Sequence, residues 1–138
     1  MGIEKSLVLI KPDAVERNLI GKVLEAYEKE DLTVKHMRMD KISKEFAKLH
    51  YKEHRGKEFF DSLISYITRG NLVAVVLEGE SAISKIRAIN GSVNCENDSI
   101  STIRRRFAIS KTENTVHASD SKESAKREIE LWFPNTYE

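Results

Sequence analysis

Two continuous apolar runs, residues 6–10 and 72–77, constrain the fold more than any other feature of the sequence. Neither run alternates between apolar and polar side chains, and neither contains a charge, which is typical of strands covered on both faces. Gly70-Asn71 precedes the second run and Glu78-Gly79 follows it, so turn-forming residues bound it. We therefore expect two buried strands, with residues 72–77 at the centre of a sheet.

Amphipathic periodicity predicts helices between the strands. Apolar residues at the i, i+3, i+4, i+7 spacing indicate a helix over residues 20–30: Ile20, Val23, Leu24 and Tyr27. Phe46 and Leu49 mark a short helix from a cap at Ser43 to about Tyr51, and residues 60–67 form a second helix closed by Gly70. These two read as a helical hairpin. A further helix begins at residue 82 and ends near Gly91.

Two weaker segments complete the sheet. Residues 32–39 indicate a strand near a sheet edge, and residues 115–117 resume an extended segment. Pro12 ends the first strand, so Lys11 projects from its end beside an open loop. The fold class is α+β: a ferredoxin-like α/β sandwich with a four-stranded antiparallel sheet, a helical hairpin, a long active-site loop, and helices covering one sheet face.

Length and composition predict a single domain over residues 1–138. With 40% hydrophobic and 33% charged residues and a net charge of +1, the chain has no overall attraction to nucleic acid or membrane. The first ten residues hold too short an apolar run for a signal peptide, and no later run could span a bilayer. The only cysteine is Cys95, which fits a reducing compartment. We expect a cytoplasmic protein.

Residues 92–113 form a long stretch without periodicity, which in a small domain is typical of a functional loop. Together with Lys11 and Arg87, Arg104 of this stretch could be gathered by the fold around one polyanion, and phosphate is the natural candidate. The sequence contains neither a G-x-x-x-x-G-K-[ST] loop nor a G-x-G-x-x-G fingerprint. A phosphate site here must therefore be built differently.

His117 is the candidate for the chemistry, because an imidazole with a pKa near 6.5 can act as a nucleophile at neutral pH. The alternative is a hydrogen-bonded structural histidine beside a helix cap. The last helix opens with a capping box at residues 120–123 and buries a stripe of Ala125, Ile129 and Trp132. Glu128 falls on that stripe, and an inward carboxylate needs a partner. Hydroxyls of Tyr51, Thr102 or Ser119 would complete a site for phosphoryl transfer through a phosphohistidine.

The segment Asn114-Thr115-Val116-His117-Ala118-Ser119-Asp120-Ser121 resembles the active-site pattern N-x-x-H-[GA]-S-D of the nucleoside diphosphate kinase family. The likeness extends along the chain. It includes Leu9-Ile10-Lys11-Pro12-Asp13, His50-Tyr51, Phe59-Phe60, Gly91, Thr102-Ile103-Arg104 and Glu130-Leu131-Trp132-Phe133.

The resemblance implies a ping-pong enzyme that moves the γ-phosphate of a nucleoside triphosphate to His117 and then to a nucleoside diphosphate, with Mg²⁺ bridging the phosphates. It assigns base stacking to Phe59, and phosphate contacts and stabilisation of the transferring group to Lys11, Tyr51, Arg87 and Arg104. Asn114 and Lys11 would bond the ribose, while Ser119 and Glu128 would orient the imidazole. The family also implies homo-oligomers, either tetramers or hexamers. The enzyme would accept different nucleotide bases, because stacking on an aromatic ring does not distinguish the hydrogen-bonding edges of the bases.

The chain departs from the family pattern within the long loop. Val93 stands where the family usually has a phosphate-contacting threonine, and a valine cannot donate that hydrogen bond. Lys111 stands where an apolar residue often borders the base. These departures leave open a weakly active scaffold or regulatory binding protein of the same family. The run Arg104-Arg105-Arg106 is short and the chain is nearly neutral, which favours a solvated or phosphate-facing loop over nucleic-acid binding.

Overall fold

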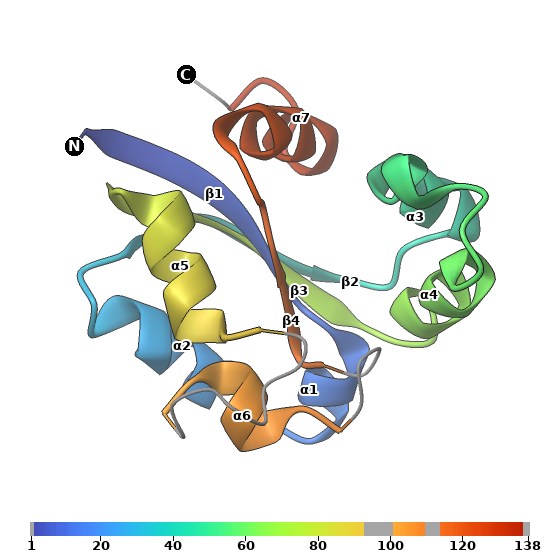
Figure 1. The fold of residues 1–138 in the computed structure, drawn as a ribbon, viewed down its shortest axis with the longest axis horizontal. Helices are drawn as coiled ribbons and strands as arrows, with labels where there is room; N and C mark the ends of the chain where they lie inside the picture. The colour runs from blue at the N-terminus through green and yellow to red at the C-terminus, as the bar shows by residue number, and fades with distance from the viewer. Residues whose placement is uncertain (1, 93–100, 110–113, 137–138) are drawn as a thin grey trace.

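Four strands form one antiparallel sheet in the computed structural model, which describes residues 2–92, 101–109 and 114–136 (Figure 1). The strands are β1 (Ile3–Ile10), β2 (Thr33–Asp40), β3 (Leu72–Glu80) and β4 (Val116–Ala118), in the order β2-β3-β1-β4. Read from the other edge, this is the 4-1-3-2 order of the ferredoxin-like sandwich. The predictions of a central β3 and an edge strand β2 are confirmed.

The predicted helices are present, and three short helical segments accompany them. The described helices are α1 (Pro12–Glu16), α2 (Ile20–Glu28), α3 (Lys44–His50), the 3₁₀ turn η1 (Lys52–His54), α4 (Phe60–Ile67), α5 (Ala82–Asn90), α6 (Ile103–Phe107) and α7 (Lys122–Trp132). The turn after α3, the open loop expected after the first strand and part of the loop expected over 92–113 are therefore helical.

Helices cover both faces of the sheet, so the expectation of one covered face was wrong. In Figure 1, α1, α2, α5 and α6 lie on one side of the sheet, and α3, α4 and α7 on the other. The pleat of β1 divides its apolar side chains between two cores: Val8 and Ile10 join the first, Leu7 and Leu9 the second. Because both faces of β1 are apolar, both need a cover.

The start of α7 differs from the predicted capping box by one residue. Ser121, rather than Asp120, is the N-cap, and its Oγ accepts a hydrogen bond from the Ser124 N–H at 3.0 Å. At the end of α5, Gly91 adopts the left-handed φ of 85°, which favours glycine at that position.

The sheet brings the two segments with the strongest motifs side by side. β1 and β4 pair so that Leu9 lies opposite His117, and just beyond them the Lys11 N–H donates to the Thr115 carbonyl at 2.9 Å. The ends of both strands therefore open at the same edge of the molecule, although about a hundred residues separate them in sequence.

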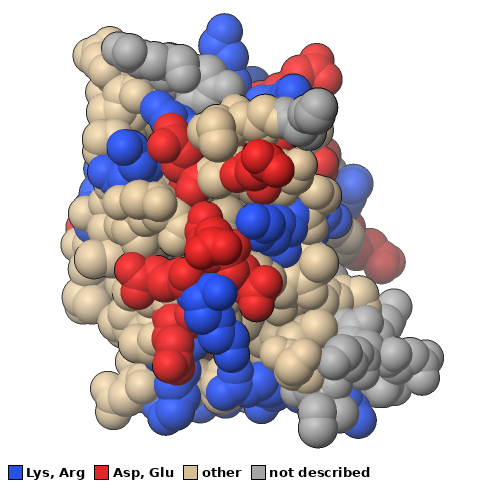
Figure 2. Space-filling view, turned by 90° about the vertical axis from the view of Figure 1, so that its left-hand side faces the viewer, with Lys and Arg blue, Asp and Glu red and all other residues tan. Residues whose placement is uncertain are grey.

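Among the described residues, none of the helices has the length and apolar character needed to cross a membrane. In Figure 2, acidic side chains gather near the centre of the face in view, and basic side chains surround them. This face therefore carries charges of both signs.

Candidate active site

A cavity of about 370 Å³ lies between α3, η1, the end of α5, α6, β4 and α7. Five residues of the predicted site line it: Tyr51, Arg87, Arg104, His117 and Glu128. A second cavity of about 340 Å³ shares Arg87 and Arg104 with the first and extends to Thr102. Arginines are therefore common to both cavities, which suits an extended anion such as a chain of phosphates.

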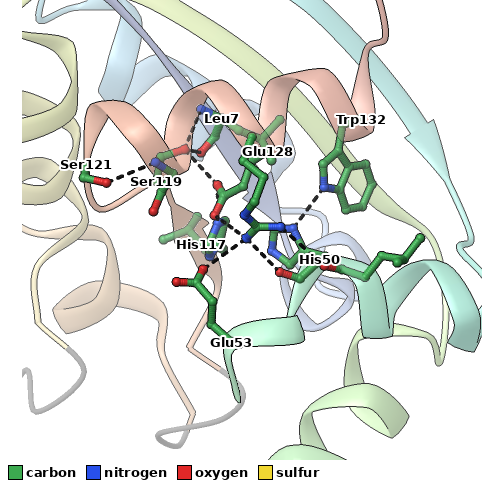
Figure 3. Close-up of polar contacts among 12 residues, drawn as sticks. Leu7, His50, Glu53, His117, Ser119, Ser121, Glu128 and Trp132 are labelled. Atoms are coloured by element: carbon green, nitrogen blue, oxygen red, sulfur yellow. Dashed lines mark hydrogen bonds and ion pairs between the residues drawn. The ribbon is translucent and has the colours of Figure 1, made fainter. Parts of the chain in front are cut away.

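His117 faces α7 because of the pleat of β4. Its neighbours Val116 and Ala118 point into the core on the α5 side, so the side chain between them points to the other face. There its Nε2 lies 3.0 Å from Glu128 Oε1 (Figure 3). A carboxylate can only accept, so the proton is on Nε2 and Nδ1 keeps its lone pair. Nδ1 makes no hydrogen bond to a described residue.

Glu128 is buried, as its place on the α7 stripe predicts, and its partners are His117 and Ser119. The Ser119 hydroxyl donates to Glu128 Oε1 at 2.8 Å and accepts the Leu7 N–H at 3.1 Å. The carboxylate is thus fixed by a serine that is itself anchored to β1 (Figure 3). A fixed carboxylate orients the imidazole and stabilises positive charge on it.

Lys11 and Asn114 form a second buried pair at the end of β1. Lys11 Nζ donates to Asn114 Oδ1 at 2.8 Å, and both side chains are almost fully buried. Burial, with a smaller contribution from nearby Arg104, lowers the pKa of Lys11 to about 7, although Asp13 partly opposes both effects. A positive charge on Lys11 is therefore costly in the free protein, and a bound anion would stabilise it.

Tyr51 and Arg104 contribute differently to the cavity wall. The Tyr51 hydroxyl is buried without a hydrogen-bond partner among the described residues. Burial raises the pKa of Tyr51, with a smaller contribution from Glu128, so the phenol stays protonated as a donor. Arg104 donates to the carbonyls of Gly91 at 2.7 Å and Val116 at 2.8 Å, which fastens α6 to the ends of α5 and β4.

Phe59 does not line either cavity. It lies at the start of α4 with 45% of its surface exposed, and its ring is 5.6 Å from that of His54, which does line the main cavity. An exposed ring beside the cavity is available for stacking from outside. The predicted contacts of Val93 and Lys111 lie outside the described residues.

Sequence reasoning placed His50 only in a segment that resembles the family and Trp132 only on a buried stripe and in a second such segment, and it gave no role to Arg127. The prediction for α3 put Leu49 on the buried stripe, yet Leu49 is 51% exposed and His50 is buried. Arg127 donates to the His50 carbonyl and to Glu53 Oε1, each at 3.2 Å, and so joins α7 to the hairpin. His50 could have been found from the sequence, because it is a polar residue on the same face of α3 as the buried Ala47. Arg127 could not, because arginines on helix surfaces are common.

One ligand atom each from His50, His117 and Glu128 lie within 4.8 Å of one another. This trio does not fit magnesium, which prefers six oxygen ligands and keeps much of its water. The arginines of the cavity suit phosphate oxygens instead, and those oxygens are themselves good magnesium ligands.

Comparisons with known proteins agree with this geometry. A family model described as "Nucleoside diphosphate kinase" matches residues 4–137. The chain is 66% identical over 137 residues to the nucleoside diphosphate kinase of a Clostridium perfringens strain, covering 99% of this chain and 96% of the relative. It is 46% identical over 130 residues to that of Methanocaldococcus jannaschii, covering 94% and 93%. A solved Aquifex aeolicus nucleoside diphosphate kinase superposes with a TM-score of 0.94 at 36% identity, covering 97% of both chains.

Proposed function

The chain belongs to the nucleoside diphosphate kinase family and transfers phosphate from nucleoside triphosphates to nucleoside diphosphates, and we propose that His117 is the residue that carries the phosphoryl group. The observation that supports this assignment is the 3.0 Å contact between His117 Nε2 and Glu128 Oε1. It leaves Nδ1 as the nucleophilic nitrogen of the ring that borders the arginine-lined cavity.

In the first half-reaction, the Nδ1 lone pair of His117 attacks the γ-phosphorus. The bond from that phosphorus to the bridging oxygen breaks, and the nucleoside diphosphate leaves with the electron pair. The ring keeps its proton on Nε2 and gains positive charge, which the Glu128 carboxylate stabilises. In the second half-reaction, a terminal oxygen of another diphosphate attacks the same phosphorus and releases neutral His117.

The remaining site residues are proposed to bind the nucleotide. Arg87 and Arg104 face the phosphates with fork-shaped donors, and Tyr51 offers its unpartnered hydroxyl. Lys11 and Asn114 are proposed to contact the phosphate and the ribose from the end of β1. Phe59 is proposed to stack on the base at the cavity rim. Val93, which lies outside the described residues, is included in the proposed nucleotide site only by its position in the family pattern.

Mg²⁺ is the proposed cofactor, carried mainly by the nucleotide phosphates. When bound, it would neutralise charge on the β- and γ-oxygens. No described residue is assigned as a magnesium ligand. The cluster of His50, His117 and Glu128 offers two imidazole nitrogens and a single carboxylate, whereas magnesium prefers oxygen ligands.

We propose further that residues 1–138 are one domain and that it forms a homo-oligomer, a tetramer or hexamer. The edge strand β2 exposes Met37 and Met39 at 54% and 53%, and an open edge with apolar side chains suits a partner of the same kind. A cytoplasmic location is also proposed, supported by the lone Cys95.

The ping-pong assignment is tested by initial rates with ATP and a second diphosphate such as GDP. Double-reciprocal plots should be parallel, because the two nucleotides never occupy the site together. The His117→Ala variant should lose turnover while keeping its nucleotide affinity. Intersecting lines, or a variant as active as the parent, would contradict the proposal. Normal turnover in the parent would also exclude the alternative of a weakly active scaffold or regulatory binding protein.

A further inference from the structure

His50 is a buried polar side chain that the proposed mechanism leaves unused. It is 3% exposed, it lies at the last turn of α3, and its ring centroid is 4.6 Å from that of His117. The two rings meet edge to face with an interplanar angle of 77°. No other described aromatic ring lies closer to the proposed nucleophile: Tyr51 is next, at 6.5 Å.

Trp132 fixes the protonation of His50. The Trp132 Nε1–H donates to His50 Nδ1 at 3.0 Å, and an indole nitrogen can only donate (Figure 3). Nδ1 is therefore unprotonated, and the single proton of the ring is on Nε2. Trp132 itself is fully buried in the second core. Its ring packs edge to face against that of Phe46, with the two ring centroids 4.7 Å apart. The donor that sets the tautomer is thus rigid.

The surroundings keep His50 neutral. Burial lowers the pKa of His50 well below its ordinary value, and His117, Arg127 and Lys11 lower it further. Its Nε2–H is buried and has no hydrogen-bond partner among the described residues, although an unpaired buried donor is costly. The edge-to-face packing of the His50 and His117 rings is the kind of arrangement in which a ring N–H is attracted to an aromatic face.

We propose that His50 is a positioning residue for His117: a neutral imidazole, anchored by Trp132, whose ring holds the His117 ring in the plane that keeps Nε2 on Glu128 and Nδ1 toward the cavity. This inference rests on the proposed role of His117 as phosphoryl carrier. A carboxylate at Nε2 fixes one point of the imidazole, but the ring can still tilt about that contact. The His50 ring removes this freedom from one side.

Neutrality of His50 also suits the reaction. When His117 gains the phosphoryl group and keeps the proton on Nε2, its ring carries positive charge. A second cation with a centroid 4.6 Å away would oppose that step, whereas a neutral ring does not.

The first test uses the parent protein alone, labelled with ¹⁵N-histidine. We expect His50 to give the shifts of a neutral ring protonated on Nε2, with a bare Nδ1. A cationic ring, or a proton on Nδ1 at neutral pH, would overturn the proposal. This measurement needs no variant and therefore does not depend on whether a substitution folds.

The second test compares substitutions at His50. His50→Asn keeps a neutral acceptor for Trp132 but removes the ring, so His117 phosphorylation by ATP should slow on the order of 10- to 100-fold. ADP affinity and melting temperature should stay near the parent values. His50→Phe restores a neutral ring and should recover part of the rate. His36→Asn is the matched control, since His36 stacks on Phe133 on the edge strand, and its rate should equal that of the parent.

The outcomes separate this inference from the proposed function. If folded His50→Asn becomes phosphorylated at the parental rate and the His117 nitrogen shifts do not change, His50 does not position the nucleophile. If the parent is never phosphorylated, or His117→Ala accepts label equally well, the proposed function itself fails. If His50→Asn fails to fold, the rate of Trp132→Phe, which removes the donor to Nδ1 together with part of a buried ring, decides in the same way.

Discussion

Glu128 shows how a single side chain can orient a histidine so that one ring nitrogen has no partner among the described residues. Its carboxylate accepts from His117 Nε2 and from the Ser119 hydroxyl, and burial excludes competing water. The position of this carboxylate was predictable from the sequence, because it shares the α7 stripe with Ala125 and Ile129. Its partners, His117 and Ser119, followed only from the family resemblance, because the pairing of β4 beside β1 is a long-range event that no local pattern shows.

Glu128→Gln should keep the hydrogen bond but lose the negative charge. The positive ring of phosphorylated His117 would then be less stabilised, and kcat should fall roughly 100-fold. KM for the nucleotide should change little, because the substitution does not touch the arginines. Glu130→Gln, an exposed change on the same helix, is the control. Equal kcat values for Glu128→Gln and the parent would show that the charge is not used.

Lys11 makes nucleotide binding depend on protons. In the free protein the pKa of its ammonium is about 7, chiefly because of burial, so at about pH 8 most of the side chain is neutral. A bound phosphate favours the charged form and raises that pKa, so binding should take up a proton. Calorimetry of ADP binding in buffers of different ionisation enthalpy measures this uptake.

Lys11→Met supplies the control for this prediction, because its thioether cannot titrate. The variant should bind ADP more weakly and should show little or no proton uptake at the same pH. If the uptake persists undiminished in Lys11→Met, another group is responsible, and Lys11 is charged before the nucleotide arrives.

At the scale of elements, segments with a readable apolar pattern were predictable, whereas the five-residue helices α1 and α6 were not. α2, α4 and α5 carry enough turns for an apolar stripe to be read, and their predicted positions agree with the structure to within two residues. α1 and α6 contain five residues each, too few to show a period. They are stabilised by tertiary contacts instead: Arg17, at the end of α1, donates to the Phe107 carbonyl of α6 at 2.6 Å.

Ser121→Ala should destabilise the protein through α7, the helix that carries Glu128. The substitution removes the acceptor for the Ser124 N–H, which should cost about 1 kcal/mol of unfolding free energy. Urea denaturation measures this change. Ser84→Ala is the matched control. The exposed Ser84 hydroxyl donates a hydrogen bond to the Ser81 carbonyl, and its loss should cost less than about 0.5 kcal/mol. Equal effects of the two substitutions would contradict the cap assignment.

At the scale of the whole molecule, the site exists because the sheet order places distant segments together. Lys11 directly follows β1, His117 lies on β4, and Glu128 lies on α7, which packs over the same region. The α+β class and the antiparallel sheet were predictable from the apolar runs. The helices were expected to cover only one sheet face, although the apolar runs at residues 7–10 of β1 and 72–77 of β3 already indicated a cover on both.

The central claim is that Nδ1 of His117 carries the phosphoryl group, and the identity of the phosphorylated atom tests it most directly. The protein is incubated with ATP, the phosphorylated form is isolated under alkaline conditions, and ³¹P and ¹⁵N NMR identify the residue and its modified nitrogen. We predict phosphate on Nδ1 of His117, with Nε2 still protonated toward Glu128. Phosphate on Nε2, or on any residue other than His117, would contradict the account.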